Sequence, residues 1–243
     1  MQAQDIKPNI IGDWISALGT VANFLVKYPI YTLVLIGMSI LDAIPSIPSL
    51  SLPELLILTY LSYPVIKFTW ARINNLDEKK VFSELKGAEG RVFGVSIIYS
   101  LRCFLLGLLL IVPGIIFAIE NSIALAVTCL EKRPIKASFN RSYELLKGMK
   151  WTAAKYMLLM PALIVIVLVG CEVLWSSYFE ANKALPSVID LKLVDRVAIF
   201  VLSIGTSMMQ LSAASVMVRL YAYAKARQEK GAAVDCEDLD AKT

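Results

Sequence analysis

Long apolar runs separated by short polar segments make up most of this sequence. Six runs stand out, at residues 30–44, 55–70, 93–112, 114–130, 152–174 and 198–221. A helix needs roughly 20 apolar residues to cross a hydrocarbon layer about 30 Å thick, and slightly fewer when flanking polar side chains reach the interface. Several runs have this length, and the shorter ones reach it with their flanks. The pattern therefore predicts an all-α integral membrane protein, a helical bundle with six spans.

The first predicted helix is amphipathic, unlike the spans that follow. Between residues 11 and 27, apolar side chains recur at helical spacing, at Ile11, Trp14, Ile15, Leu18, Val21 and Leu25. The opposite face carries Asp13, Ser16, Thr20 and Asn23. A helix with this pattern lies in the plane of the membrane interface. We therefore predict one membrane domain: an interfacial helix at residues 1–27, a six-span bundle at 28–222, and a disordered cytoplasmic tail at 223–243.

Two later segments resemble this first helix in design. Residues 77–86 and 134–147 are short, charged and amphipathic, and each precedes a predicted span. Gly87 and Gly148 follow them at positions where a glycine ends a helix in the left-handed conformation. The order of these segments along the chain predicts three repeated units. Each unit consists of an interfacial helix, a span, an outer turn and a second span. The alternative is that any cytoplasmic loop between spans tends to be basic and amphipathic, and both interpretations remain open.

The placement of charge predicts the orientation. The sequence is 57% hydrophobic, with a mean hydropathy of +0.65 and a net charge of +4. Lysine and arginine gather after the second, fourth and sixth runs, at residues 72–91, 132–150 and 219–230, whereas the alternate connections hold few. Cytoplasmic loops carry the excess of positive charge in membrane proteins, so both termini are predicted to be cytoplasmic.

Residue types needed for common catalytic sites are missing. The chain has no histidine, and its four cysteines, Cys103, Cys129, Cys171 and Cys236, show no metal-binding spacing. Phosphate-binding, zinc-protease and nucleophile-elbow motifs are also absent. We therefore expect a protein that is not an enzyme and that uses no cofactor, no metal and no nucleic acid.

Four polar residues inside the apolar runs are candidate ligand-binding residues: Arg102, Glu120, Asn121 and Gln210. Ionisable groups at membrane depth are costly, and they often mark a site. Pro113-Gly114 is predicted to form a tight outer turn, which would make the third and fourth spans adjacent and antiparallel. Arg102 would then lie near the midplane and reach Glu120. This pair is either structural or part of a hydrated cavity that holds an anionic headgroup or solute.

Other polar positions have simpler explanations. Lys67 lies near the cytoplasmic end of its span and can extend to the interface. Ser203 and Ser207 form a small-residue face in the last span, which favours close contact between helices.

The stretch RSYELLKGMKW at residues 141–151 resembles a motif of known bacterial membrane proteins. It is similar to the RSweLxkGxxW segment of the membrane domain that accompanies some glycerophosphoryl diester phosphodiesterases, and of related YciC-like proteins. LIVPGIIF at residues 110–117 resembles their upstream VPGII turn, and VRLY at 218–221 resembles the close of their last span. The resemblance implies a six-span, multi-pass protein of the bacterial inner (cytoplasmic) membrane, without enzymatic activity and linked to the maintenance of the cell envelope.

Two functions remain open from the sequence. The first is a non-enzymatic envelope protein whose basic interfacial helices bind anionic lipid headgroups, a protein partner or a second copy of the chain. The alternative is a small-solute or lipid carrier that uses an intramembrane site at Arg102 and Glu120. An intramembrane enzyme would need a metal set or a nucleophile with its base, and the sequence offers neither.

Overall fold

A computed structural model describes residues 8–42, 51–109, 111–159 and 191–240, together with residues 162, 166, 170, 173 and 177. These residues are helical apart from short turns, and the described part of the chain contains no strand. The all-α prediction is therefore confirmed. About half of the predicted fifth span lies outside the described residues, and so do most of the outer connection that follows it and most of the outer connection at residues 45–53.

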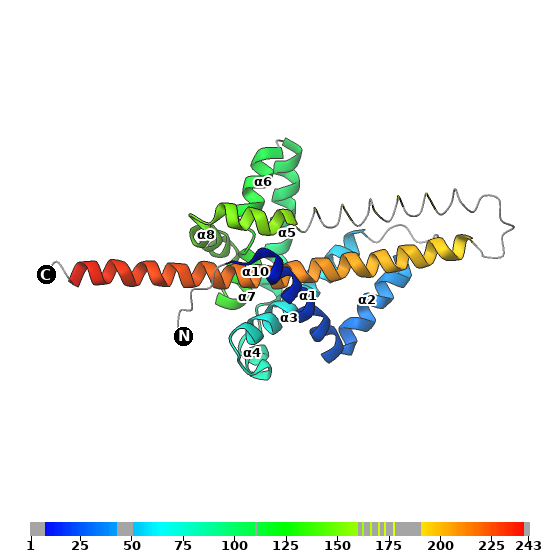
Figure 1. Ribbon diagram of the computed structural model, residues 1–243, viewed down its shortest axis with the longest axis horizontal. Coiled ribbons are helices and arrows are strands. Elements are labelled where there is room, and N and C mark those ends of the chain that lie inside the picture. The colour runs from blue at the N-terminus through cyan, green and yellow to red at the C-terminus, as the bar shows by residue number, and fades with distance from the viewer. Residues whose placement is uncertain are drawn as a thin grey trace.

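One long helix, α10 (Leu191–Asp240), is the element on which the others assemble. Figure 1 shows it running along the whole molecule, with α1 (Ile10–Lys27) and α3 (Ser51–Ile73) packed at its middle. The short helices α7 (Ala124–Glu131) and α8 (Ile135–Leu146) contact the same part of α10. Residues from opposite ends of the sequence therefore meet in one place.

The main core forms at this crossing. Its fully buried side chains include Tyr156, Tyr221, Ile123, Val127 and Leu146. Burying a large apolar side chain stabilises a fold by about 1.5–3 kcal/mol where the alternative is contact with water. A second cluster joins α1 and α2 (Pro29–Asp42) to α3 and α10 through Phe24, Phe68 and Leu211.

The predicted antiparallel pairing of the third and fourth runs is confirmed. The hydroxyl of Tyr99 in α5 (Glu89–Leu109) donates to the carbonyl of Ala118 in α6 (Ile111–Glu120), at 3.2 Å. Figure 1 shows this pair projecting away from the rest of the molecule. The prediction of a turn at Pro113-Gly114 was wrong, because both residues lie in the first turn of α6. Proline fits there, since the first amide groups of a helix have no partner within it.

The fourth run is not one continuous helix, which corrects another prediction. A turn at residues 121–123 separates α6 from α7. The amide of the Asn121 side chain donates to the carbonyl of Phe117 at 2.9 Å. Such local side-chain bonds compete with the regular ladder and favour the end of a helix.

Helix α1 buries a face that mixes the two predicted sets of residues, because Trp14, Val21 and Leu25 of the predicted apolar face are buried together with two residues of the predicted polar face, while Ser16 and Asn23 are exposed. Asp13 and Thr20 are buried, with Asp13 only 6% exposed, whereas Ile11 and Ile15 are 67% and 66% exposed. The predicted orientation of the two faces was therefore wrong for these residues. Amphipathic spacing identifies two faces but not the environment of each, and here apolar chains point outward as they do beside lipid.

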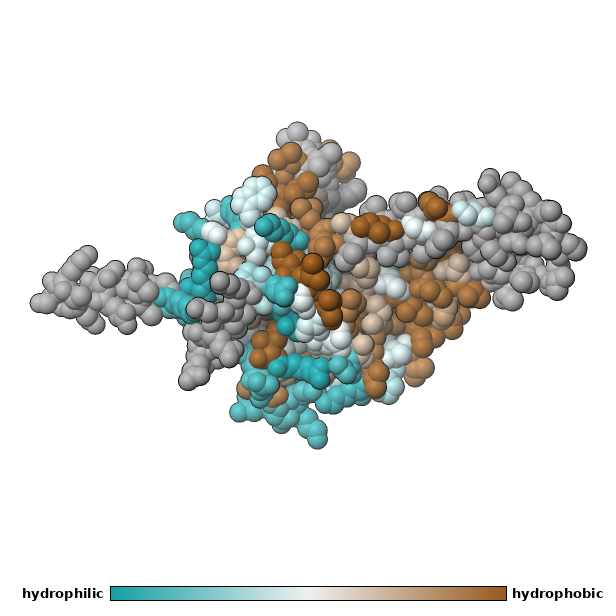
Figure 2. Space-filling view, in the orientation of Figure 1, coloured by the Kyte–Doolittle hydropathy of each residue, from teal (hydrophilic) through white to brown (hydrophobic). Residues whose placement is uncertain are grey.

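Three described segments are long and apolar enough to cross a membrane: Ile10–Lys27, Val112–Glu131 and Arg196–Lys230. The first is the helix that the sequence placed in the interface plane. Figure 2 shows hydrophobic residues over α2, α6 and the adjacent part of α10, and hydrophilic residues over α4 (Glu78–Glu84) and around α8. On this face of the molecule the described residues are therefore divided between an apolar and a polar part.

The two predicted glycine caps are confirmed. Gly87 follows α4 with φ +89°, and Gly148 follows α8 with φ +83°. A side chain strains the backbone in this region, and glycine does not. The guanidinium of Arg227 in α10 donates to the carbonyl of Gly148 at 2.9 Å, so the second cap is also tied to the long helix.

The predicted disordered tail was wrong for residues 223–240, because α10 continues through them to Asp240. Tyr223 is half-buried and Ala224 is buried against the core. These contacts, with the strong helix formers lysine, arginine, glutamine and glutamate that follow, favour continuation of the helix.

Small and hydroxyl residues bring α10 close to its neighbours, as the small-residue face predicted. Ser203 donates to the hydroxyl of Ser39 in α2 at 3.1 Å, and Thr69 of α3 donates to that of Ser215 at 3.0 Å. The amine of Lys67 donates to the carbonyl of Phe82 in α4 at 3.5 Å, so the side chain reaches one of the predicted interfacial segments. Lys67 is buried, 4.0 Å from the ring centre of Tyr63, where the aromatic face attracts the cation.

Gly87 and Gly90 offer a matched test of the first cap. No atom lies near the space that a methyl group would occupy at either position, but only Gly87 has a positive φ. Gly87→Ala is expected to lower the free energy of unfolding by about 1–2 kcal/mol. Gly90→Ala lies in a helix and is expected to raise it by up to about 1 kcal/mol. Equal effects of both variants in detergent unfolding would contradict the role of the cap.

Candidate functional site

A cavity of about 240 Å³ lies where α3, α5, α7 and α10 meet. Its floor is buried and includes Ile66 of α3 and Ala126 of α7. Gln210 of α10 also lines it and is exposed, so the cavity opens at that residue. All four helices belong to apolar runs of the sequence, and the cavity therefore lies within the apolar part of the molecule.

The cavity combines apolar walls with uncharged polar groups. Leu58, Val95 and Met217 are among its apolar lining residues, and no charged residue lines it within the described part of the chain. The polar lining residues come from separate elements: Thr59, Ser62, Ser96, Tyr99, Asn121, Ser122 and Gln210. Two of the four predicted site residues, Asn121 and Gln210, are thus brought together, although 89 positions separate them.

Some polar groups of the cavity make no hydrogen bond among the described residues, and one of them is buried. The hydroxyl of Ser122 is buried, with the residue 9% exposed, and makes no hydrogen bond. The side-chain amide of Gln210 likewise has none there. Most buried polar groups in proteins are hydrogen-bonded, and an orphaned one costs about 1–3 kcal/mol. The pattern of bonds around the cavity is therefore incomplete.

Arg102 lies elsewhere, on the exposed surface of α5. Its guanidinium carbon is 6.0 Å from the ring centre of Phe117 and 5.5 Å from that of Phe139 in α8. The side chain therefore reaches back toward the polar segment that contains α8. This is how a long cationic side chain escapes an apolar environment.

Glu120 pairs with Lys150 and not with Arg102, which corrects the predicted ion pair. The amine of Lys150 lies 2.5 Å from a carboxylate oxygen of Glu120, and this hydrogen bond raises the pKa of the lysine above its usual value. The hydroxyl of Ser142 in α8 donates to the backbone carbonyl of Glu120 at 3.0 Å. The end of α6 is therefore attached to α8 and to the start of the next helix.

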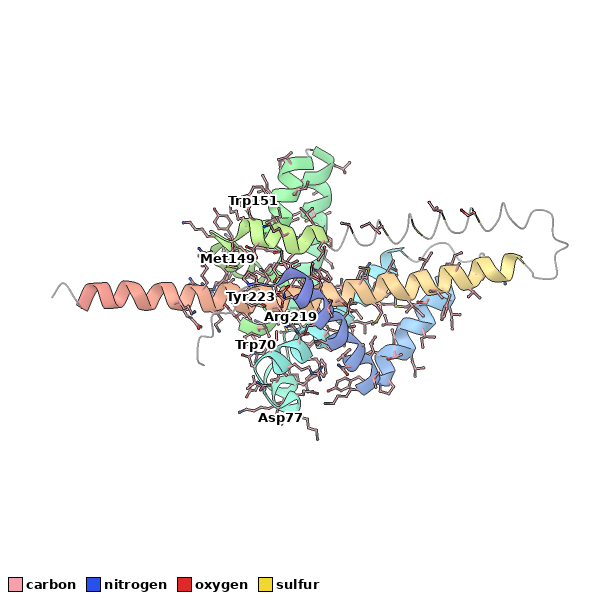
Figure 3. The ribbon with its side chains drawn as sticks, in the orientation of Figure 1. Trp70, Asp77, Met149, Trp151, Arg219 and Tyr223 are labelled. Carbon is pink, nitrogen blue, oxygen red and sulfur yellow. The ribbon has the colours of Figure 1, made fainter. Side chains whose placement is uncertain are left out.

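A buried polar cluster that the sequence pattern missed is centred on Asp13 of α1. Tyr156, from the helical segment 150–159, donates to one carboxylate oxygen of Asp13. Tyr223 of α10 donates to both oxygens, at 2.9 and 3.0 Å. Arg219 lies 3.8 Å from the carboxylate and donates to the hydroxyl of Ser16 at 2.7 Å. Figure 3 shows Arg219 and Tyr223 close together on α10 where α1 passes it.

A weak signal for this cluster was present in the sequence. Arg219 and Tyr223 are four residues apart and share a helix face, and Asp13 is an acidic residue in the first turn of a helix. Nothing in the spacing relates the two helices to each other or to Tyr156. Pairing over about 200 positions is decided by the fold.

The basic surface is defined by five exposed lysines in the polar part of the molecule: Lys79, Lys86, Lys132, Lys136 and Lys147. None has an ion pair within the described residues, whereas Lys27, Lys150 and Arg133 pair with Glu78, Glu120 and Glu131. They belong to α4, to α8 and to the segments next to them, where Figure 2 shows hydrophilic residues. Their charge is available to an external anion.

Comparison with known proteins gave no relative. No family model matches the chain, and no curated protein or solved structure matches it. The resemblance to the phosphodiesterase-associated membrane domain therefore stays a prediction. In the described part of the chain, no group of three or more histidine, cysteine, aspartate or glutamate side chains is placed to hold a metal ion.

Asp13→Ala is expected to lower the free energy of unfolding by about 2–4 kcal/mol, because two tyrosine hydroxyls and a guanidinium lose their shared acceptor. Tyr223→Phe removes one donor and should cost about 1–2 kcal/mol. Asn23→Ala, on the exposed face of the same helix, is the control and should change stability by less than about 0.5 kcal/mol. Unfolding of the purified protein in mixed detergent measures all three. An Asp13→Ala protein as stable as the control would show that the cluster does not hold α1.

Proposed function

We propose that this chain is a non-enzymatic integral membrane protein that binds anionic lipid headgroups at the cytoplasmic face and serves in maintaining the cell envelope. The observation that carries the proposal is the basic surface, in which five exposed lysines have no ion pair among the described residues. Most of the other polar contacts at this end of the molecule are already made within the chain. The surface is the part left for a partner.

The expected strength of the interaction is considerable. A lysine close to an anionic membrane surface contributes about 1 kcal/mol, and the contribution falls off within a Debye length of about 8 Å in physiological salt. We propose that several of the lysines, which lie on helices next to the apolar part of the molecule, come within this distance of the headgroups. An acidic protein segment or a second copy of the chain would use the same charges, and lipid is favoured because the surface borders the membrane-facing helices.

We further propose six spans, with both termini cytoplasmic, in a bacterial inner membrane. Three membrane-length segments, the α5–α6 pair and the exposed apolar faces support a multi-pass arrangement. The concentration of lysine and arginine around α4, α8 and the later part of α10 supports the orientation, since these segments would share the cytoplasmic side.

The three-unit repeat remains part of the same proposal. Helices α4 and α8 are each followed by a glycine with positive φ and then by another helix. The first unit differs, because α1 ends at Lys27 and is followed by Tyr28 with φ −123° and then by Pro29. Two units thus share a local device that the first does not use.

The carrier alternative has less support. It requires Arg102 and Glu120 in one site, and they are separately engaged, Arg102 with aromatic rings and Glu120 with Lys150.

Neutralising single lysines tests the lipid proposal. Lys136→Gln and Lys147→Gln are each expected to lower affinity for phosphatidylglycerol about fivefold, the equivalent of about 1 kcal/mol. Native mass spectrometry of the protein in mixed phosphatidylglycerol and phosphatidylcholine micelles measures the lipid retained. Arg196→Gln removes the same charge at the opposite part of α10 and should leave the preference unchanged. Equal retention of both lipids by the unaltered protein would rule out the proposal.

A topology measurement tests the orientation independently. A reporter that is active only outside the cytoplasm is expected to be active when inserted near residue 183 and silent when fused after residue 230. A reporter active only in the cytoplasm should give the opposite result. The same response at both positions would contradict the six-span topology. The lipid-binding proposal is tested independently, by the lipid-retention measurement.

A further inference from the structure

The cavity between α3, α5, α7 and α10 has a size that suits part of a lipid. Its volume of about 240 Å³ is several times the roughly 30 Å³ that a water molecule occupies in the liquid. It is slightly smaller than the pockets of about 300–1,000 Å³ that enclose a drug-sized ligand completely. A headgroup fits inside, and acyl or isoprenoid chains would remain outside against the helices.

The helices around the cavity are suited to such chains. Ile57 and Tyr60 of α3 and Ile97 of α5 are exposed, although they are large and apolar. Gln210 lies on the segment Arg196–Lys230, which is long and apolar enough to cross a membrane, and exposed apolar side chains on neighbouring helices would lie against lipid there. A ligand that enters at Gln210 would therefore come from the bilayer.

Charge decides the class of headgroup. No lysine, arginine, aspartate or glutamate lines the cavity within the described residues. A phosphate or an ammonium group would lose its hydration on entering and would gain no opposite charge in return, which costs far more than a few hydrogen bonds supply. The cavity therefore excludes the anionic headgroups that the basic surface attracts.

The unpartnered groups define what an uncharged headgroup must offer. The buried hydroxyl of Ser122 can donate to a carbonyl or ether oxygen. The amide of Gln210, at the mouth, has a donor and an acceptor and no partner in the described chain. A ligand oxygen at the floor would accept a hydrogen bond from Ser122. A second polar group of the ligand, near the mouth, would form a hydrogen bond with the amide of Gln210.

We propose that this cavity binds a membrane lipid with an uncharged, oxygen-bearing headgroup, of the diacylglycerol or isoprenoid quinone kind. The site is separate from the basic surface, and its ligand differs from the anionic lipids proposed there. Diacylglycerol offers a hydroxyl and ester carbonyls, whereas a quinone offers carbonyls alone. The carbonyl oxygens of either lipid can accept a hydrogen bond from the hydroxyl of Ser122. The hydroxyl of diacylglycerol can also donate to the side-chain carbonyl of Gln210.

The test uses the full-length protein in phosphatidylcholine nanodiscs that contain dioleoylglycerol, ubiquinone or neither. Native mass spectrometry is expected to detect one retained neutral lipid per chain with at least one of the two, which also identifies the source. Ser122→Ala removes a hydroxyl that makes no bond in the protein, so thermal stability should be unchanged while affinity falls roughly twofold to tenfold. Gln210→Leu should give a loss of similar size, and more for dioleoylglycerol than for ubiquinone.

Ser83→Ala is the matched control, because this serine lies on α4, outside the cavity, and should leave neutral-lipid retention unchanged. Failure to retain either neutral lipid would overturn the proposal. So would retention that is equal in the Ser122→Ala protein and the unaltered one, or displacement of the neutral lipid by phosphatidylglycerol at equal concentration. If a variant fails to fold, retention by the unaltered protein and its competition with phosphatidylglycerol still decide the result.

Discussion

The carboxylate of Asp13 is the contact on which the arrangement of the helices depends. It accepts hydrogen bonds from Tyr156 and Tyr223 and lies 3.8 Å from Arg219. These residues belong to α1, the helical segment 150–159 and α10, which are far apart in the sequence. A buried carboxylate is costly unless it is paired and hydrogen-bonded, so the helices must hold the orientation that supplies its partners. Apolar packing alone is tolerant of sliding and rotation, and the polar contact fixes the position of α1 on α10.

This contact also explains the unusual faces of α1. The helix turns Asp13 and Thr20 toward the core and leaves Ile11 and Ile15 exposed. In water this arrangement would be unfavourable, because each exposed isoleucine would forgo the stabilisation of about 1.5–3 kcal/mol that its burial would provide. Beside lipid the cost disappears, since the surroundings are apolar as well. The buried face of α1 thus combines Asp13 and Thr20 with apolar residues such as Trp14 and Phe24, and the isoleucines outside it suit contact with lipid.

Charged and uncharged polar groups have different surroundings in this molecule. The charged side chains are paired, as in Glu120 with Lys150, stacked on rings, as in Arg102, or exposed at the polar end, as in Lys136. The uncharged groups Ser122 and Gln210 face a cavity among the apolar helices. This separation follows the cost of transfer from water, which is far greater for a charge than for a hydroxyl or an amide. It also divides the two proposed lipid interactions, with anionic headgroups at the basic surface and an uncharged headgroup in the cavity.

The sequence by itself determined the helical class, the apolar segments, the adjacency of α5 and α6, and the caps at Gly87 and Gly148. Each depends on spacing or conformation within a short stretch of chain. Asn121 and Gln210 could also be recognised as unusual, because polar residues inside apolar runs are visible without a structure. Their meeting in one cavity, the partner of Glu120, and the cluster around Asp13 were decided by the tertiary structure. In α1 the pattern identified an amphipathic helix, but the buried face takes Asp13 and Thr20 from the predicted polar side and leaves Ile11 and Ile15 of the predicted apolar side exposed. Periodicity records which residues share a face, and the identity of the neighbour, whether core, lipid or water, is settled only when distant helices pack together.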